Sequence, residues 1–271
     1  MDINQEGWSK ERIDYYNKVS NMRWSYSRLT ALNSCPFCFY QTYIMGDRGE
    51  GNAFAEVGTL MHDILERYHK GELSMLDLEE TFTNEFAKIP YEFPPNNYVD
   101  LAETYYYGCL EYLEDPDLVD LVDYNVLETE LEIDIDIGGY KFIGFIDLVL
   151  EHKATGNLVI ADYKSKAKFN STEERDDYAR QLYIYAKGVF EKYGKYPTML
   201  VFIHFRKQKQ TKIRFDKEVY DKTLEWAVET IEQIKLVDEF PVKKERVPFF
   251  TRYMCSHRNN PNHRQGYVVK L

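Results

Sequence analysis

After about residue 123 the spacing of apolar residues changes from the three- and four-residue period of helices to the two-residue period of strands. The segment NVLETELEIDI alternates apolar and acidic residues, which indicates a strand with one face in water. Gly138-Gly139 predicts a tight hairpin, and YKFIGFIDLVL predicts the returning strand. A chain that forms this hairpin after a helical first third is restricted to a fold of mixed α and β structure.

The rest of the second half continues this pattern of strands and helices. The turn at Gly156-Asn157 precedes a third strand, LVIADYK, and Pro197 opens a fourth at TMLVFIHF. A short strand, KIRF, follows. Helices are expected over about 172–193 and 217–238.

The first third is expected to be helical. One helix is predicted to begin at Ser27 and to run through Leu32 into CPFCFYQTYI. The segment EVGTLMHDILERYHKGEL predicts an amphipathic helix that stops at Gly71. Two further helices are predicted over 75–88 and 97–114, with the breaker IPYEFPPNN between them.

These elements predict an α/β or α+β fold, with a mixed central sheet flanked by helices and a helical N-terminal portion. We expect a helical region over 1–123, a core over 124–240 and an irregular basic tail over 241–271. The tail is expected to pack back on the N-terminal region.

Composition excludes several classes of protein. The 271 residues are 44% hydrophobic and 29% charged, as in a globular protein, and no apolar run approaches the ~20 residues that a bilayer span requires. The first residues are polar and lack the apolar segment of a signal peptide. Four cysteines in this length favour a reducing, cytoplasmic location over a secreted disulfide framework.

The net charge of −11 argues at first against a nucleic-acid partner, but the charge is unevenly distributed. Residues 72–163 hold 22 acids and 3 bases, whereas residues 164–217 hold 14 bases and 6 acids and residues 241–271 hold 7 bases and 1 acid. Exposed charges separated by more than ~8 Å are largely screened from one another, so an acidic chain can still present a basic surface. Solvated helix faces are the alternative interpretation.

The residues that most strongly indicate chemistry lie in two apolar strands. Asp147 lies within GFIDLVL, where a carboxylate is costly unless a cation compensates it. Asp162 lies near the end of LVIADYK, and Lys164 projects from the same face because it is two residues further along the strand. Two carboxylates brought together by a hairpin predict a site for Mg²⁺ or Mn²⁺, beside a lysine that can orient water or stabilise phosphate charge. A buried salt bridge between Lys164 and one aspartate is the alternative.

This arrangement resembles the core of PD-(D/E)xK nucleases, with Asp147 followed by Asp162-Tyr163-Lys164. Two further segments resemble the RecB-like branch of that superfamily, which includes CRISPR-adaptation nucleases and phage recombination exonucleases. Gly58-Thr-Leu-Met-His62 is similar to the G-x-x-x-H helix of that branch, and Gln181-Leu-Tyr-Ile-Tyr185 is similar to its Q-x-x-x-Y helix.

The resemblance implies a restriction-endonuclease-like core and assigns roles to these residues. The implied ligands of one or two Mg²⁺ or Mn²⁺ ions are His62, Asp147, Asp162 and the backbone carbonyl of Tyr163. Lys164 would position the attacking water, and Gln181 and Tyr185 would orient Lys164 or the scissile phosphate.

Cysteine usage departs from the resemblance. The opening segment WSYSRLTALNSCPFCFYQTYI is similar to that of RecB-like nucleases, many of which hold an iron–sulfur cluster with one N-terminal and three C-terminal cysteines. Here the C-terminal tail has one cysteine, so this cluster is not expected. A structural zinc site is the alternative that remains, with ligands drawn from Cys35, Cys38, Cys255, His257 and His263. Ordinary buried cysteines and exposed tail histidines are the other interpretation, and Cys109 is expected in the core.

Several basic and aromatic residues are candidates for contacts to DNA. Those nearest the expected site are Lys166, Lys168, Arg175 and Arg180. A second strip is expected around the last hairpin, at Arg206, Lys207, Lys209, Lys212 and Arg214. Tyr105, Tyr106 and Tyr107 offer rings for base stacking, although core packing is the alternative for them. Glu130, on the strand before Asp147, could approach the metals, but a solvated strand edge is the favoured interpretation.

The predicted function is therefore that of a metal-dependent deoxyribonuclease, in particular an exonuclease acting on single- or double-stranded DNA ends in recombination, repair or phage DNA processing. The alternatives are a nuclease-fold DNA-binding protein and a subunit that is active only with a recombinase, an annealing protein or a helicase. No GxxxxGK[ST] motif occurs, so a helicase motor would be a separate chain. A bacterial cell or a phage-infected host is the expected setting.

Overall fold

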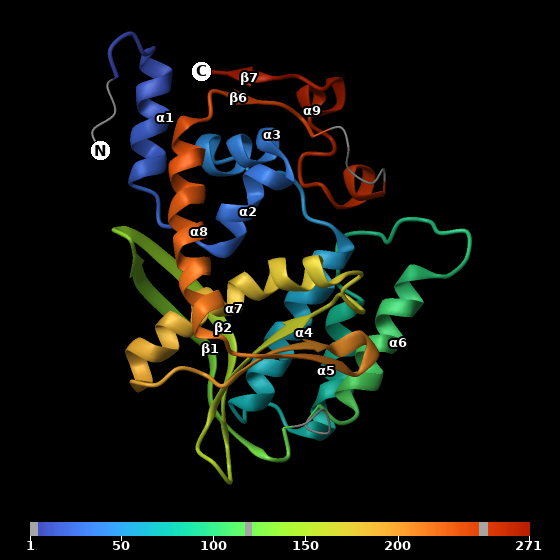
Figure 1. Ribbon diagram of the computed structural model, residues 1–271. Helices are drawn as coiled ribbons and strands as arrows, with labels where there is room; N and C mark the ends of the chain where they lie inside the picture. The colour runs from blue at the N-terminus through green and yellow to red at the C-terminus, as the bar shows by residue number, and fades with distance from the viewer. Residues whose placement is uncertain (1–4, 117–120, 244–248) are drawn as a thin grey trace. The chain divides into compact units, whose positions relative to one another are not determined.

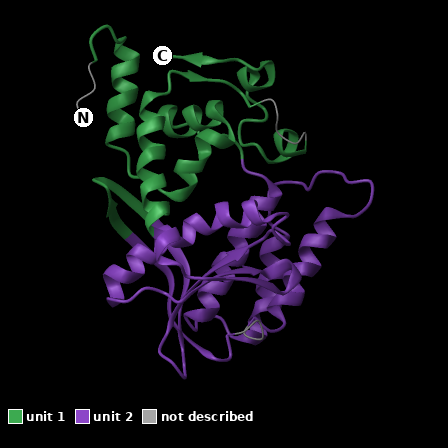
Figure 2. Ribbon diagram, in the orientation of Figure 1, with its two compact units in different colours: residues 1–50, 134–143, 221–271 green, residues 51–133, 144–220 purple. Residues whose placement is uncertain are grey.

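The computed structural model describes residues 5–116, 121–243 and 249–271. These residues form two compact units, shown in different colours in Figure 2. Unit 1 comprises 1–50, 134–143 and 221–271, and unit 2 comprises 51–133 and 144–220. The candidate residues of the nuclease site, His62, Asp147, Asp162, Lys164, Gln181 and Tyr185, belong to unit 2.

A mixed five-stranded sheet has the order β1-β2-β3-β4-β5. Its strands are β1 (Tyr124–Ile137), β2 (Tyr140–His152), β3 (Leu158–Lys164), β4 (Met199–His204) and β5 (Lys209–Arg214). Strand β3 is antiparallel to β2 and parallel to β4, and β5 is antiparallel to β4. This mixed sheet with flanking helices confirms the predicted fold class, a restriction-endonuclease-like α/β fold.

Helices of unit 2 pack on both faces of this sheet. Helix α7 (Thr172–Tyr193) connects the parallel strands β3 and β4 and lies along one face, as Figure 1 shows. Helices α4 (Ala53–His69), α5 (Leu78–Phe86) and α6 (Leu101–Leu113) share a buried core with Val159, Ala161 and Tyr163 on the other face. Because strand residues alternate between faces, Asp162 and Lys164 point to the α7 side.

Strand β1 confirms the alternation expected from its sequence. Ile133, Ile135 and Ile137 are buried, and the acidic residues between them are exposed. The hairpin to β2 is also confirmed. Both Gly138 and Gly139 have positive φ angles, of 59° and 89°, which a two-residue type I′ turn requires and which side chains disfavour.

Unit 1 contains the two ends of the chain. Its helices are α1 (Lys10–Ser20), α2 (Tyr26–Ser34), α3 (Pro36–Phe39), η1 (Tyr40–Met45), most of α8 (Lys217–Leu236), η4 (Phe250–Met254) and α9 (Pro261–Gln265). Strands β6 (Glu239–Phe240) and β7 (Val269–Lys270) form a separate two-stranded sheet. The predicted irregular tail over 241–271 thus contains three short regular elements, η4, α9 and β7, and most of its other described residues are irregular. Residues 244–248 lie outside the described part.

The predicted helix from Ser27 into CPFCFYQTYI is wrong in two respects. The N-cap is Ser25, whose side chain accepts a hydrogen bond from the Arg28 N–H, because the chain enters the helix two residues earlier. The helix also breaks at Cys35, which is extended with φ −166° and ψ 105°. Pro36 explains this break, since proline disfavours helical geometry in the preceding residue and is well suited to the first position of a new helix.

The other helix boundaries differ by smaller amounts. The predicted helix over 75–88 divides into a 3₁₀ turn, η2 (Met75–Asp77), and α5, because Ser74 and Asp77 form a capping box there. Helix α6 begins at Leu101, after the Asp100 side chain caps it. Helix α7 has the predicted bounds. No helix in the described part of the chain is both long and apolar enough to cross a membrane.

Candidate active site

The pairing of β2 with β3 brings the two in-strand aspartates together. Leu148 pairs with Ala161, so the next position along this register places Asp147 opposite Asp162. The Tyr163 backbone N–H donates a 2.6 Å hydrogen bond to the Asp147 carboxylate. Asp147 and Asp162 are both buried, at 7% and 3% exposure. Two buried carboxylates at one strand end are costly without a compensating cation.

Helix α4 directs His62 at this strand end. The helix is capped by Asn52 and buries Val57, Met61 and Leu65 against the sheet. His62 Nδ1 lies 3.5 Å from an Asp147 carboxylate oxygen, and its Nε2 lies 3.2 Å from the Tyr163 carbonyl oxygen. An Nε2–H that donates to this carbonyl fixes the ring and leaves Nδ1 facing the carboxylates.

Glu130 joins the same group, which its interpretation as a solvated strand residue did not anticipate. Its carboxylate lies 3.6 Å from His62 Nδ1, and ligand atoms of His62, Glu130 and Asp147 all lie within 4.8 Å of one another. Glu130 has a φ angle of 48° within β1, in the left-handed region that a side chain disfavours. Backbone strain of this kind concentrates at functional sites, and here it accompanies a carboxylate turned toward two other ligand groups.

A chain of polar contacts runs from Asp162 to α7. The Lys164 ammonium lies 2.6 Å from an Asp162 carboxylate oxygen and donates to the Gln181 side-chain carbonyl at 3.1 Å. The Gln181 amide in turn donates to the Tyr185 hydroxyl at 2.9 Å. Gln181 and Tyr185 occupy one face of α7 because they are four residues apart. The structure thus brings together the five residues predicted to be catalytic.

The charges of the site favour a bound cation. Burial raises the pKa of Asp162 above its ordinary value, although the neighbouring Lys164 ammonium acts to lower it. Burial lowers the pKa of Lys164, but the attraction of Asp162 outweighs this and raises it. Apart from this ion pair, the buried Asp162 oxygen nearest Lys164 has no hydrogen-bond partner among the described residues. Two carboxylates buried at one strand end offer the oxygen ligands that a hard divalent cation prefers.

The neighbouring carboxylates strongly shift the pKa of His62. Burial lowers the pKa of its imidazole, but hydrogen bonds to Asp147 and Glu130 outweigh burial and raise the pKa to about 10. In the metal-free protein the imidazolium therefore neutralises part of the acidic charge. A divalent cation would take over that role by displacing a proton from Nδ1.

His69 is a further residue that the sequence interpretation missed. Its Nε2 lies 2.8 Å from the Tyr163 hydroxyl, and the two rings stack with centroids 6.4 Å apart. His62 also meets the Tyr163 ring edge-on, so two histidines of α4 contact the residue between Asp162 and Lys164. Their seven-residue spacing, two helical turns, is a signal that could have paired them.

Comparison with protein families identifies the superfamily of the chain. The model of the PD-(D/E)XK nuclease superfamily matches residues 23–259, which is most of the chain. The chain belongs to the PD-(D/E)XK nuclease superfamily. No curated protein matches its sequence. Members of this superfamily are nucleases that typically use divalent metals, and the acidic group of His62, Glu130 and Asp147 is consistent with such a metal.

The residues predicted to contact DNA near the candidate active site are mostly paired with acids. Lys166 lies 2.8 Å from Glu174, and Arg175 and Arg180 pair with Asp176 and Asp177, at 2.6 and 3.1 Å respectively. Lys168 is exposed. Ion pairs of this kind on the surface are weak, and a phosphate can replace the carboxylate.

Of the basic residues around the last hairpin and the three tyrosines predicted to contact DNA, some pack against the protein and others are exposed. Arg206 stacks 3.6 Å over the Tyr105 ring and donates to the Ser165 carbonyl, so it is held against the protein. The other basic residues of this strip are exposed: Lys207, Lys209, Lys212 and Arg214. Tyr105 and Tyr106 pack among neighbouring aromatic rings, whereas Tyr107 is 62% exposed.

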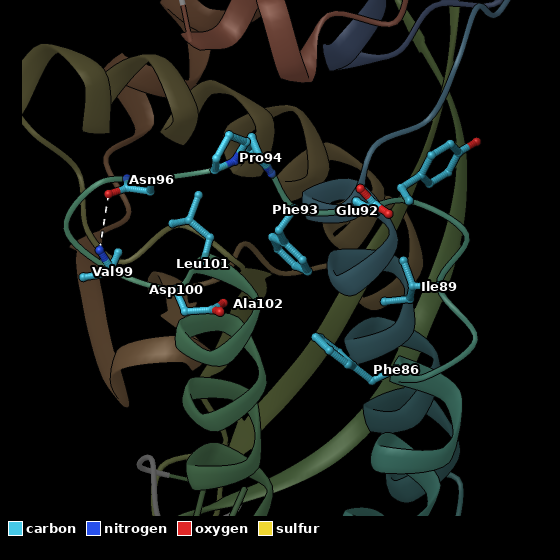
Figure 3. Close-up of a pocket in the computed structure, with 12 residues that line it drawn as sticks. Phe86, Ile89, Glu92, Phe93, Pro94, Asn96, Val99, Asp100, Leu101 and Ala102 are labelled. Carbon is cyan, nitrogen blue, oxygen red and sulfur yellow. Dashed lines mark hydrogen bonds between the residues drawn. The ribbon is translucent and has the colours of Figure 1, made fainter.

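A pocket of about 630 Å³ lies elsewhere in unit 2, along residues 86–102. Figure 3 shows Phe86, Phe93 and Leu101 lining it, and its charged lining residues are Glu92 and Asp100. None of its lining residues is basic, and none belongs to the nuclease motifs. The pocket is therefore separate from the candidate active site.

Unit 1 holds a second cluster of metal-ligand residues. Four of the five predicted ligands, Cys35, Cys38, Cys255 and His263, lie together there. The fifth, His257, faces Asp47 instead, with Nε2 3.1 Å from the Asp47 carbonyl oxygen. Cys109 is buried in unit 2, as expected.

Proposed function

We propose that this nuclease hydrolyses phosphodiester bonds of DNA in a reaction that requires Mg²⁺ or Mn²⁺. The observation that carries this proposal is the convergence of His62, Glu130 and Asp147 within 4.8 Å, beside the ion pair of buried Asp162 with Lys164. Carboxylate oxygens with one imidazole are ligands suited to these ions.

In this proposal His62, Glu130, Asp147 and Asp162 hold the metal, and the Tyr163 carbonyl either joins them or only orients His62. The bound metal would polarise the scissile phosphate and lower the pKa of an attacking water. The Tyr163 N–H donates a hydrogen bond that orients the Asp147 carboxylate, and the Tyr163 carbonyl orients the His62 ring. Preorganised ligands lose little conformational freedom when the ion binds.

Lys164 would supply the positive charge that the transition state needs. Its ammonium remains protonated beside Asp162 and is held by Gln181, so it can donate to a phosphate oxygen or orient the attacking water. Gln181 and Tyr185 act as positioning residues, since each hydrogen bond in the chain fixes the orientation of the next group.

The finer assignment is an exonuclease of the RecB-like branch that acts on ends of linear DNA in recombination, repair or phage DNA processing. It is supported by the order of His62, Asp147, Asp162-x-Lys164 and Gln181-x-x-x-Tyr185 along the chain. A recombinase, an annealing protein or a helicase is the proposed kind of partner, and the cytoplasm the proposed location.

The test is cleavage of end-labelled linear single- and double-stranded DNA and of closed circular DNA. The purified protein is assayed with Mg²⁺, Mn²⁺ or EDTA, beside Lys164→Ala and the control Lys195→Ala, which removes an exposed lysine distant in sequence from the motifs. We expect metal-dependent shortening of linear DNA by the wild type and the control, and a loss of at least about 100-fold in Lys164→Ala.

Full activity in Lys164→Ala would contradict the site. Cleavage of the closed circular DNA would support nuclease activity but would contradict the assignment as an exonuclease, because an exonuclease requires a free DNA end. Binding of DNA without cleavage in any metal, by folded protein, would instead favour the binding protein or the partner-dependent subunit.

A further inference from the structure

A cluster of three cysteines and one histidine in unit 1 has no part in the nuclease site. Cys35 and Cys38 lie at the start of α3, Cys255 follows η4, and His263 is in the short helix α9. The tail and the N-terminal segment are adjacent here, because the Phe37 N–H also donates to the Pro241 carbonyl. Segments more than 200 residues apart in the chain therefore meet at four side chains of the types that bind zinc in proteins.

Three separations within this cluster match those around one tetrahedral ion, and ligand atoms of Cys35, Cys38 and His263 all lie within 4.8 Å of one another. Zinc bonds of ~2.3 Å to sulfur and ~2.0 Å to nitrogen place two thiolates about 3.8 Å apart, and a thiolate and a nitrogen about 3.6 Å apart. The Cys38 and Cys255 sulfurs are 3.5 Å apart. His263 Nε2 lies 3.5 Å from the Cys255 sulfur and 3.9 Å from the Cys35 sulfur.

These distances fit neither a disulfide nor an iron–sulfur cluster. A disulfide requires sulfurs about 2.05 Å apart, and all four cysteines are free thiols. An iron–sulfur cluster binds its four ligands through separate iron atoms, which spreads them further apart than a single ion does. The short separations and the imidazole ligand therefore differ from the cluster found in many RecB-like nucleases.

His263 rather than His257 completes the set. His257 is occupied at both ring nitrogens, by the Asp47 carbonyl on Nε2 and by the Ser256 hydroxyl on Nδ1. His263 directs Nε2 at the sulfurs, and its place is fixed because the Asn260 side chain caps α9 and Gly266 ends it with a φ of 71°.

Three of the four side chains of the cluster are buried, and Cys38 is half-buried. Cys35, Cys255 and His263 are 1%, 3% and 5% exposed, and the Phe37 ring packs edge-on against His263. Three thiols and an imidazole form one of the usual ligand sets of structural zinc, and a set of four protein ligands leaves no open position for catalysis. Thiolates also select zinc over Mg²⁺ or Mn²⁺, which prefer oxygen.

We propose that Cys35, Cys38, Cys255 and His263 bind one structural Zn²⁺ ion, which fastens the C-terminal tail to the N-terminal segment of unit 1. The ion closes a very long loop of chain, and the entropy of closing a loop grows with its length. Its binding free energy is thus added to the stability of unit 1. This proposal is independent of the nuclease function.

The test is the metal content of the full-length protein, measured by inductively coupled plasma mass spectrometry. The protein is expressed without a metal-binding affinity tag. We expect about one zinc per chain in the wild type and at least about a tenfold loss in Cys255→Ser and His263→Gln. Three matched variants should keep their zinc. Cys109→Ser changes the buried cysteine of unit 2, His257→Gln changes the neighbouring histidine, and Asp147→Asn changes the nuclease site.

Replacement of zinc by Co²⁺ in the wild type gives a second readout that does not need a folded variant. Visible bands of tetrahedral cobalt with thiolate ligands would support the site. Zinc that persists in both Cys255→Ser and His263→Gln would overturn it, as would iron with acid-labile sulfide, a Cys38–Cys255 disulfide, or the absence of zinc from the wild type. Loss of zinc from Asp147→Asn alone would place the ion in the nuclease site and would overturn the proposal.

Discussion

The backbone N–H of Tyr163 donates a 2.6 Å hydrogen bond to the carboxylate of Asp147 on the neighbouring strand. A residue of the Asp162-Tyr163-Lys164 sequence therefore holds the aspartate of the preceding strand through its main chain. The contact does not depend on the identity of the side chain at 163. It couples the folding of the β2–β3 pair directly to the geometry of the candidate metal ligands.

Two substitutions of Asp147 separate these structural and chemical effects. Asp147→Asn keeps an oxygen that can accept the Tyr163 N–H, whereas Asp147→Ala leaves this buried donor unpaired at a cost of about 1–3 kcal/mol. We expect both variants to lose at least about 100-fold in cleavage rate, because both lose the charged ligand. Denaturant unfolding should show a lower free energy of unfolding for Asp147→Ala than for Asp147→Asn. Equal stability of the two would contradict the structural role.

Glu130 is expected to be a metal ligand despite its position in β1. Glu130→Gln removes the charge that faces His62 Nδ1 at 3.6 Å while keeping the size of the side chain. We expect the metal concentration for half-maximal cleavage to rise about 10–100-fold. Glu132→Gln is the matched control, because Glu132 is exposed on the same strand. If the two variants respond alike to metal, Glu130 is a surface carboxylate.

His62 predicts a specific dependence on pH. Its pKa in the folded, metal-free protein is about 10, above the value of ~6.5 in an unfolded chain. Protonated His62 therefore stabilises the fold fully below about pH 6.5, and this stabilisation is lost as the pH rises through about 10. In EDTA the unfolding midpoint should fall over this range in the wild type, and fall less in His62→Gln.

Binding of Mn²⁺ at pH 7–8 should also release about one proton from His62, because only the neutral ring binds metal. Titration calorimetry in two buffers of different ionisation enthalpy measures this release. Buffer-independent heats in the wild type would show that His62 does not bind the ion.

Local patterns predicted those parts of the fold that depend on nearest neighbours. The bounds of α7, the alternation of β1 and the hairpin at Gly138-Gly139 follow from periodicity and from the turn residues themselves. The helix break at Cys35 was missed although Pro36 signals it, because the apolar spacing continues through the break. The N-cap was predicted at Ser27 instead of Ser25 because both serines precede the same apolar residues, so the sequence does not distinguish them.

Residues of the site were predictable only where burying their charge among apolar neighbours would cost free energy. Asp147 and Asp162 attract notice because apolar strands surround them. Glu130 does not, because an acidic residue in an alternating strand is ordinary and nothing in the sequence indicates a φ of 48° at that residue. The distinction between His257 and His263 depends on which ring nitrogens are already occupied, and this is a property of the folded tail alone.

Gly144 is expected to be required because Tyr185 fills the space where a side chain would lie. A Cβ at Gly144 would come 2.5 Å from the Tyr185 ring and 3.3 Å from its hydroxyl. Gly144→Ala should therefore displace a ring that is 7% exposed and weaken its hydrogen bond from Gln181. We expect a lower melting temperature and a cleavage rate reduced by about tenfold or more, since Lys164 loses its positioning.

Comparisons with other variants test whether the clash with Tyr185 causes the effects of Gly144→Ala. Tyr185→Phe keeps the ring and removes only the hydroxyl, so its effect on the melting temperature should be smaller than that of Gly144→Ala. Gly58→Ala in α4 is the control for stability, because a Cβ there meets nothing within 4 Å and alanine favours a helix by about 0.5–1 kcal/mol. In the double variant Gly144→Ala/Tyr185→Leu the smaller side chain relieves the clash, so the losses of stability should not add. Strict additivity would show that Gly144 acts independently of Tyr185, through some other neighbour on its strand.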